Sequence, residues 1–168
     1  ASYNSIRFAS TYETYSRDFN IENILNQRGI LIKEELAWEI EQGQSVTDED
    51  LKKAREVYEE YKQWLERVYG FFDVLALPSA QVWPFTMHDR FPKVIENHTM
   101  DTYHRWMSIC VPVSFGGLPC VTIPAGFGGK DNKLPIGVQL FGNRGDDLKL
   151  LSLAYEYHRL VKDEKVKL

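Results

Sequence analysis

The sequence contains few cysteines, and this scarcity excludes one class of fold. Cys110 and Cys120 are the only two among 168 residues. Two cysteines cannot build the disulfide network that stabilises many small secreted proteins, so a reducing cytosol is the simpler setting. We therefore expect a cytoplasmic protein. The two residues also lack the paired spacing that is typical of a zinc site.

Long apolar runs and large basic patches are missing as well. The longest uncharged run includes 107–129, which contains three prolines and five glycines, so it cannot form a helix that spans a membrane. The formal net charge is -4, which gives no argument for nucleic-acid binding. The four histidines include no pair at the spacing of a helical metal site. We expect no membrane, nucleic-acid or metal partner.

What is present is the composition of an ordinary globular protein. Hydrophobic residues make up 43% of the chain and charged residues 26%, and no repeat or low-complexity linker divides it. The length suits one domain with a real core better than two. We predict a single domain over 1–168. Because the chain opens with Ala1 rather than Met, there is room for an upstream portion.

Hydrophobic periodicity predicts two helices in the first half of the chain. In Ile32–Gln42 apolar residues recur at four-residue steps, and Gly43 is expected to close that helix. A capping-box-like start at Thr47 predicts a long amphipathic helix, which Gly70 is expected to end in a left-handed conformation. The opening segment, Ser2–Asn26, has only weak periodicity, so we expect irregular structure with at most a short helix there.

Three short apolar runs bounded by proline or glycine predict buried strands. They are Phe71–Leu77, Cys120–Ile123 and Ile136–Phe141. Residues 128–133 are rich in Gly, Lys, Asp and Asn, so we expect a turn between the last two strands.

Between and after these strands the sequence predicts a long loop and two more helices. Gln81–His98 contains two prolines and no consistent period, and loops of this length are usually functional or lid-like. A helix is expected from Thr102 to Cys110, and another begins at Asp146 and Asp147. One face of that last helix carries Leu148, Leu151, Ala154, Tyr155 and His158. The alternation of helices and strands indicates an α/β fold with helices covering a sheet.

The two last strands carry a recognisable motif. The run Gly117–Phe127 reads GLPxxxxPxGF, and Leu134–Gly142 reads LPIGVQLxG. This pattern closely resembles the carboxyl-terminal part of the amidase signature family, serine amidohydrolases that cleave carboxamides. Three further blocks, 71–80, 100–107 and 145–151, are similar to that family in the same order and with compatible spacing. The resemblance implies part of the amidase signature fold, a mixed β-sheet covered by α-helices.

The resemblance also implies a catalytic apparatus that this sequence lacks. The family uses a serine nucleophile, a second serine across a cis peptide and a lysine, with a Gly/Ser-rich loop supplying the oxyanion donors. No such loop occurs in the 168 residues, and Ser114–Gly117 lies just before the GLP motif rather than in the nucleophile position. We therefore assign no catalytic residue. The resemblance implies neither a metal nor an organic cofactor.

The resemblance does imply one wall of a substrate pocket. In relatives the helix end before the GLP motif approaches the active site, which here places Trp106, Met107 and Cys110 near the substrate. All three are uncharged, which favours an apolar or aromatic carboxamide. In glutamine-specific, transfer-RNA-dependent members we expect an acidic residue near position 107, and Met107 departs from this. The alternative is that these residues simply belong to the core, where Met and Trp on a helix usually pack.

Two hypotheses about function follow. In the first, the chain is the carboxyl-terminal part of an amidase that acts on a small carboxamide, and is inactive alone because its catalytic amino-terminal portion is absent. In the second, it is a stand-alone, non-catalytic relative that binds a partner or a small ligand. Sheet edges left without their usual neighbours favour either self-association or pairing with the missing portion.

Overall fold

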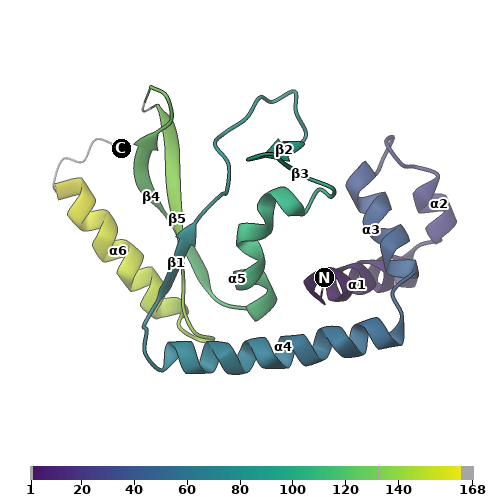
Figure 1. Ribbon diagram of the computed structural model, residues 1–168, viewed down its shortest axis with the longest axis horizontal. Helices are drawn as coiled ribbons and strands as arrows, with labels where there is room; N and C mark the ends of the chain where they lie inside the picture. Colours follow the sequence, from purple (N-terminus) through teal and green to yellow (C-terminus); the bar gives the residue numbers. More distant parts are fainter. Residues whose placement is uncertain (1, 132, 164–168) are drawn as a thin grey trace. The chain divides into compact units, whose positions relative to one another are not determined.

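The computed structural model describes residues 2–131 and 133–163 of the chain. They fall into two compact units, Ala1–Lys62 and Gln63–Leu168. The first is helical, whereas the second combines a three-stranded sheet with helices (Figure 1). Whether 1–168 forms one domain stays a prediction. None of the helices in the described ranges has the length and apolar character needed to cross a membrane.

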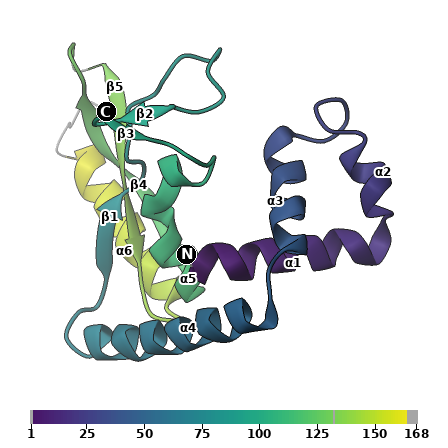
Figure 2. The ribbon, with the colours of Figure 1, turned by 45° about the vertical axis from the view of Figure 1, so that its right-hand side comes forward.

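The first unit is built from helices α1 (Ser2–Asp18), α2 (Ile21–Leu25) and α3 (Glu34–Gln44), followed by the start of α4 (Asp48–Tyr69). The prediction of an irregular opening segment is therefore wrong. Helix α1 is long, but its polar composition gives little periodicity, and it depends on packing against α3 (Figure 2).

Aromatic packing and an ion pair help to hold α1 to α3. Phe8 is buried and meets the Trp38 ring edge to face, with the centroids 5.1 Å apart. The Arg7 guanidinium donates to both carboxylate oxygens of Glu39, at 3.2 and 3.0 Å. Glu39 is only 5% exposed, so this pairing satisfies a charge that would otherwise be costly to bury.

Gly43 does not end α3, as the sequence predicted, but lies inside the helix and is buried. A Cβ atom at Gly43 would overlap the carbonyl oxygen of Phe8 and the Cβ of Tyr12. Gly43 is therefore required by the close approach of α1, and α3 continues past it to Gln44.

We predict that Gly43→Ala destabilises the protein by about 1–3 kcal/mol, because the added methyl group forces α1 away from α3. Urea unfolding followed by circular dichroism measures this change. The control is Gln44→Ala, an exposed neighbour in the same turn. If the two helices were not in close contact, Gly43→Ala would instead stabilise the helix by about 1 kcal/mol through its higher propensity.

The start of α4 is as predicted, and its end differs. Asp50 N–H donates to the Thr47 hydroxyl oxygen at 3.2 Å, while Thr47 N–H donates to the Asp50 carboxylate at 3.1 Å, which is a reciprocal capping box. Gly70 follows the helix without a positive φ, so the left-handed ending is wrong. Its N–H instead donates to the carbonyls of Glu66 and Arg67.

The sheet of the second unit has the order β1-β5-β4, and both ladders are antiparallel. The strands are β1 (Leu75–Pro78), β4 (Cys120–Gly128) and β5 (Leu134–Phe141). The two predicted strands of the motif are confirmed, and both are longer than expected, but the expected burial is wrong for β4, whose residues are all exposed or half-buried. The strand predicted at Phe71–Leu77 is partly wrong, because it begins only at Leu75 and Phe71 is 85% exposed.

The long loop after β1 is confirmed, except for a small hairpin of β2 (Val94–Ile95) and β3 (His98–Thr99). The single helix predicted over 102–110 is wrong. The chain forms a 3₁₀ helix, η1 (Arg105–Cys110), followed by α5 (Val111–Gly116). The break has a local cause: proline at position 112 suits the first turn of a new helix.

Helix α6 (Asp147–Asp163) packs on β4, and this arrangement is visible in Figure 1. Leu150 is 2% exposed on the packed side, and the Tyr157 hydroxyl donates to the Pro124 carbonyl at 2.6 Å. The Lys149 ammonium donates to the Asp73 carboxylate at 2.7 Å, which ties the start of α6 to the turn before β1. This bond lowers the pKa of Asp73, with the Lys149 charge as a second cause.

We predict that Lys149→Gln returns the pKa of Asp73 towards its ordinary value. Carbon-detected NMR titration of the Asp73 carboxyl measures the shift, and Lys149→Arg, which keeps the charge, is the control. Because the folded-state pKa is lowered, the ionised carboxylate stabilises the fold above its unfolded pKa of about 3.9, and this contribution is lost as the pH falls through the folded value. An unchanged titration in Lys149→Gln would contradict the assigned contact.

Candidate functional site

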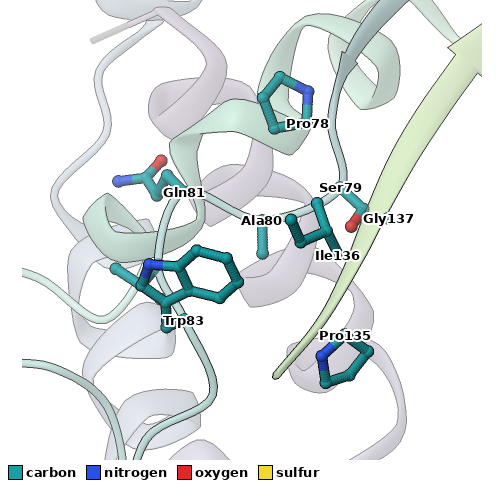
Figure 3. A pocket seen from close by; sticks show the side chains of 9 residues that line it. Pro78, Ser79, Ala80, Gln81, Trp83, Pro135, Ile136 and Gly137 are labelled. Atoms are coloured by element: carbon teal, nitrogen blue, oxygen red, sulfur yellow. The ribbon is translucent and has the colours of Figure 1, made fainter. Parts of the chain in front are cut away.

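A pocket of about 230 Å³ opens beside the sheet of the second unit. Residues 78–83, at the end of β1 and in the loop that follows, line one side, and residues 135–137 of β5 line the other. Figure 3 shows the Trp83 ring on the loop side and Ile136 and Pro135 along the strand. The lining is mostly apolar, and Ser79 and Gln81 supply polar groups.

Close backbone packing at two glycines creates this pocket. Ser79 N–H donates to the Gly137 carbonyl at 2.9 Å, and a Cβ at Gly137 would come within 2.6 Å of the Ser79 hydroxyl oxygen. The loop therefore leaves the sheet directly against β5. A Cβ at Gly128 would likewise come within 2.6 Å of the Trp83 ring. These glycines let the loop and the indole approach the hairpin closely.

Buried Gln139 connects the pocket to η1. Its side-chain amide donates to the carbonyls of Pro78 at 2.9 Å and Ile109 at 3.2 Å, and the residue is 5% exposed. The first carbonyl belongs to the pocket lip and the second to the turn that carries the predicted substrate wall. One side chain on β5 thus fixes the spacing of these two segments.

Gln81 strengthens the same connection from the loop side. Its amide nitrogen donates to the Arg105 carbonyl at 3.1 Å. Its amide oxygen accepts hydrogen bonds from the Ser108 hydroxyl and the Ile109 N–H, both at 3.1 Å. Three bonds from one side chain bind the pocket loop to η1, so the two segments form one rigid wall.

The predicted wall residues lie on η1, which Gln81 bonds to the pocket loop, and none of the three lines the pocket. Trp106 packs edge to face against Phe85, with the centroids 5.5 Å apart, and also contacts Tyr103. Met107 is half-buried at a non-helical point of η1. The Cys110 sulfur lies 3.9 Å from the carbonyl oxygen of Ser79, a lining residue. A role for the three in substrate binding stays a prediction.

Sequence reasoning missed the residues that shape this pocket, namely Trp83, Gln81 and Gln139. Trp83 and Gln81 lie in the loop for which only a general functional role was expected. For Gln139 a signal was available: an amide in the middle of an apolar strand must find hydrogen-bond partners when the strand is buried. Its partners are carbonyls of segments distant in sequence, so the signal could not name them.

The titratable groups near the hairpin do not form a reactive centre. The pKa of the Cys120 thiol is raised, chiefly by desolvation and further by Cys110. A raised pKa keeps the thiol protonated at neutral pH, where it is a weak nucleophile and a weak metal ligand. Among the residues that the structure describes, no three His, Cys, Asp or Glu side chains gather at a distance suited to a metal ion.

We predict that Gln139→Leu destabilises the protein by about 1–3 kcal/mol, because it removes the two hydrogen bonds that this buried amide donates to the carbonyls of Pro78 and Ile109. Guanidinium unfolding measures the loss. Gln81→Leu is the matched control. Gln81 is more exposed, so water can replace its bonds and the cost is smaller. An equal cost for the two variants would contradict the role assigned to Gln139.

A family model and the proteins that are similar in sequence indicate the same family. A family model described as Amidase matches residues 2–151. One subunit of the glutamyl-tRNA(Gln) amidotransferase of Alkaliphilus metalliredigens is 33% identical over 104 residues, covering 62% of this chain and 20% of that protein. The corresponding protein from Chlorobium phaeobacteroides, which has the same name, is 36% identical over 112 residues, covering 64% and 21%. This chain thus spans about a fifth of the length of these relatives.

Solved structures resemble this chain in fold. A bacterial aryl acylamidase of the amidase signature enzymes superposes with a TM-score of 0.66 at 20% identity, covering 90% of this chain and 30% of that one. A 6-aminohexanoate cyclic dimer hydrolase gives a TM-score of 0.61 at 20% identity, covering 87% and 31%. At this identity the likeness concerns the fold alone.

Proposed function

This chain belongs to the amidase family and has the amidase signature fold, and on that premise we propose that it is the carboxyl-terminal portion of an amidase. The complete enzyme hydrolyses a carboxamide to a carboxylate and ammonia or an amine. The observation that carries the proposal is the family match over residues 2–151 in a chain that spans about a fifth of its relatives and contains no Gly/Ser-rich loop. The catalytic serine and lysine belong to polypeptide outside these residues.

The reaction assigns a positioning role to this portion. A serine oxygen attacks the carboxamide carbon, the nitrogen leaves as ammonia or an amine after taking up a proton, and water then hydrolyses the serine ester. The base that removes the serine proton and the oxyanion donors lie on the absent portion. This chain contributes a surface against which the substrate is held, so that the scissile carbon meets the serine in a fixed geometry.

The chemistry of that surface favours an apolar or aromatic carboxamide. Trp106, Met107 and Cys110 are uncharged. The adjacent pocket is lined mostly by apolar side chains, including Trp83 and Ile136. An amino-acid-like substrate carries an ammonium group, and burying it against such a wall without a carboxylate partner is costly. For this reason the proposed substrate of this chain differs from glutamyl-tRNA(Gln), which the names of its curated relatives contain.

We predict that the purified chain forms no adduct with a fluorophosphonate, a reagent that modifies activated serines. Intact-mass spectrometry measures this directly, and a serine hydrolase treated in parallel is the positive control. The physical reason is that an unactivated serine hydroxyl is a poor nucleophile, and no described residue supplies the family's Ser–Ser–Lys arrangement.

A second sample makes this test decisive for the proposed function. The chain is co-expressed with the part of the Alkaliphilus protein that this chain does not match, and the purified material is treated with the same reagent. We expect an adduct on the larger polypeptide alone, together with hydrolysis of benzamide. A stoichiometric adduct on a serine of this chain would overturn the assignment of catalysis to the absent portion. Binding without hydrolysis of any carboxamide would overturn the amidase function.

A further inference from the structure

Helix α6 has apolar side chains on two opposite sides, although only one side packs against the sheet. The packed side carries Leu150, which is 2% exposed. The other side carries Leu148, Leu151 and Tyr155, which recur at three- and four-residue steps and are 79%, 58% and 66% exposed. This is the face that the sequence pattern identified, and the structure turns it to solvent. A helix with apolar residues on both sides is typical of a helix covered on both sides.

Two further exposed aromatic residues lie in the turn before β1, near the start of the same helix. Phe71 is 85% exposed and Phe72 is 58% exposed. The bond between Lys149 and Asp73 joins this turn to the first turn of α6, because Asp73 directly follows Phe72 and Lys149 directly follows Leu148. At 3.6 residues per turn, Lys149 lies about 160° from Leu151 around the helix, so this turn lies on another side of α6. We therefore call only the three apolar residues of α6 the docking surface: Leu148, Leu151 and Tyr155.

A surface of this kind needs an occupant, since soluble monomers rarely expose several large apolar side chains together. This chain covers 30% of the length of the aryl acylamidase and 31% of the length of the cyclic dimer hydrolase. Most of the polypeptide found in that fold is therefore outside these 168 residues. A second copy of this chain could cover α6 through a two-fold contact. That contact through α6 would leave the outer edges of β1 and β4 open, since within the described residues each of these strands pairs with β5 alone.

We propose that the docking surface binds the amino-terminal, serine-bearing portion of an amidase signature polypeptide, and that this contact joins the two parts of the enzyme. The choice of partner rests on the proposed function. Burial of the three side chains of α6 provides the apolar contact area. The pocket wall is connected to the same unit through the sheet, so docking at α6 also sets the position of the pocket relative to the serine.

The test compares two leucines of α6 that differ in position but not in exposure. Leu151 is 58% exposed and Leu160 is 56% exposed. Nine residues of a helix make about two and a half turns, so these side chains lie on opposite sides of α6. The probe is the unmatched part of the Alkaliphilus protein, co-expressed with this chain carrying an affinity tag. We expect a one-to-one complex with the wild type, at least tenfold less complex with Leu151→Glu, and wild-type amounts with the control Leu160→Glu.

Tyr155→Glu is a second variant on the docking surface, and circular dichroism of each chain alone verifies that it is folded. The proposal is overturned if the wild type does not retain the probe, or if Leu160→Glu weakens the complex as much as Leu151→Glu. It is also overturned if Leu151→Glu abolishes a homodimer but leaves probe binding intact. A complex that depends on Leu151 but hydrolyses no carboxamide keeps the docking surface and rejects the proposed function. Hydrolysis that is indifferent to Leu151→Glu rejects only the docking surface.

Discussion

Strand β5 is the element on which the second unit depends. It pairs with β1 on one side and β4 on the other, and its last residue, Phe141, accepts a hydrogen bond from the Tyr69 hydroxyl at the end of α4. Its Gln139 holds the pocket lip and η1 at a fixed spacing. A strand with two ladders and a buried amide cannot shift register by one residue without breaking both kinds of contact. The geometry of the pocket is therefore determined largely by β5, which also lines one side of it.

Much of this fold follows from the sequence. The hairpin of β4 and β5, the capping box at Thr47 and the start of α6 were all predicted, because each is specified by residues close together in the chain. Helix α1 was not, because its stability comes from Phe8 and the Arg7–Glu39 pair, partners that lie about thirty positions apart. The pocket was missed for the same reason: its shape depends on contacts of Gln139 and Gly137 with a distant loop.

Another group of errors has a different physical origin. The apolar run at 71–77 predicts a buried strand, yet Phe71 and Phe72 face solvent. Periodicity in α6 identified a real apolar face, and that face is also exposed. Rules that place apolar residues in a core assume that the chain buries its own apolar surface. Both failures concern large apolar side chains that the described part of this chain leaves exposed.

In the proposed enzyme, substrate binding and serine catalysis belong to different parts of the polypeptide. A substrate wall can be built by packing and neutral hydrogen bonds, and it keeps its shape without any activated group, as the bonds of Gln81 and Gln139 illustrate. A serine nucleophile, by contrast, requires a base and oxyanion donors held within hydrogen-bond distance of it. In the proposed enzyme the first task falls to this chain and the second to the rest. The contact between the two parts then determines how well the scissile carbon meets the serine, so an error of about 1 Å there can cost roughly a hundredfold in rate.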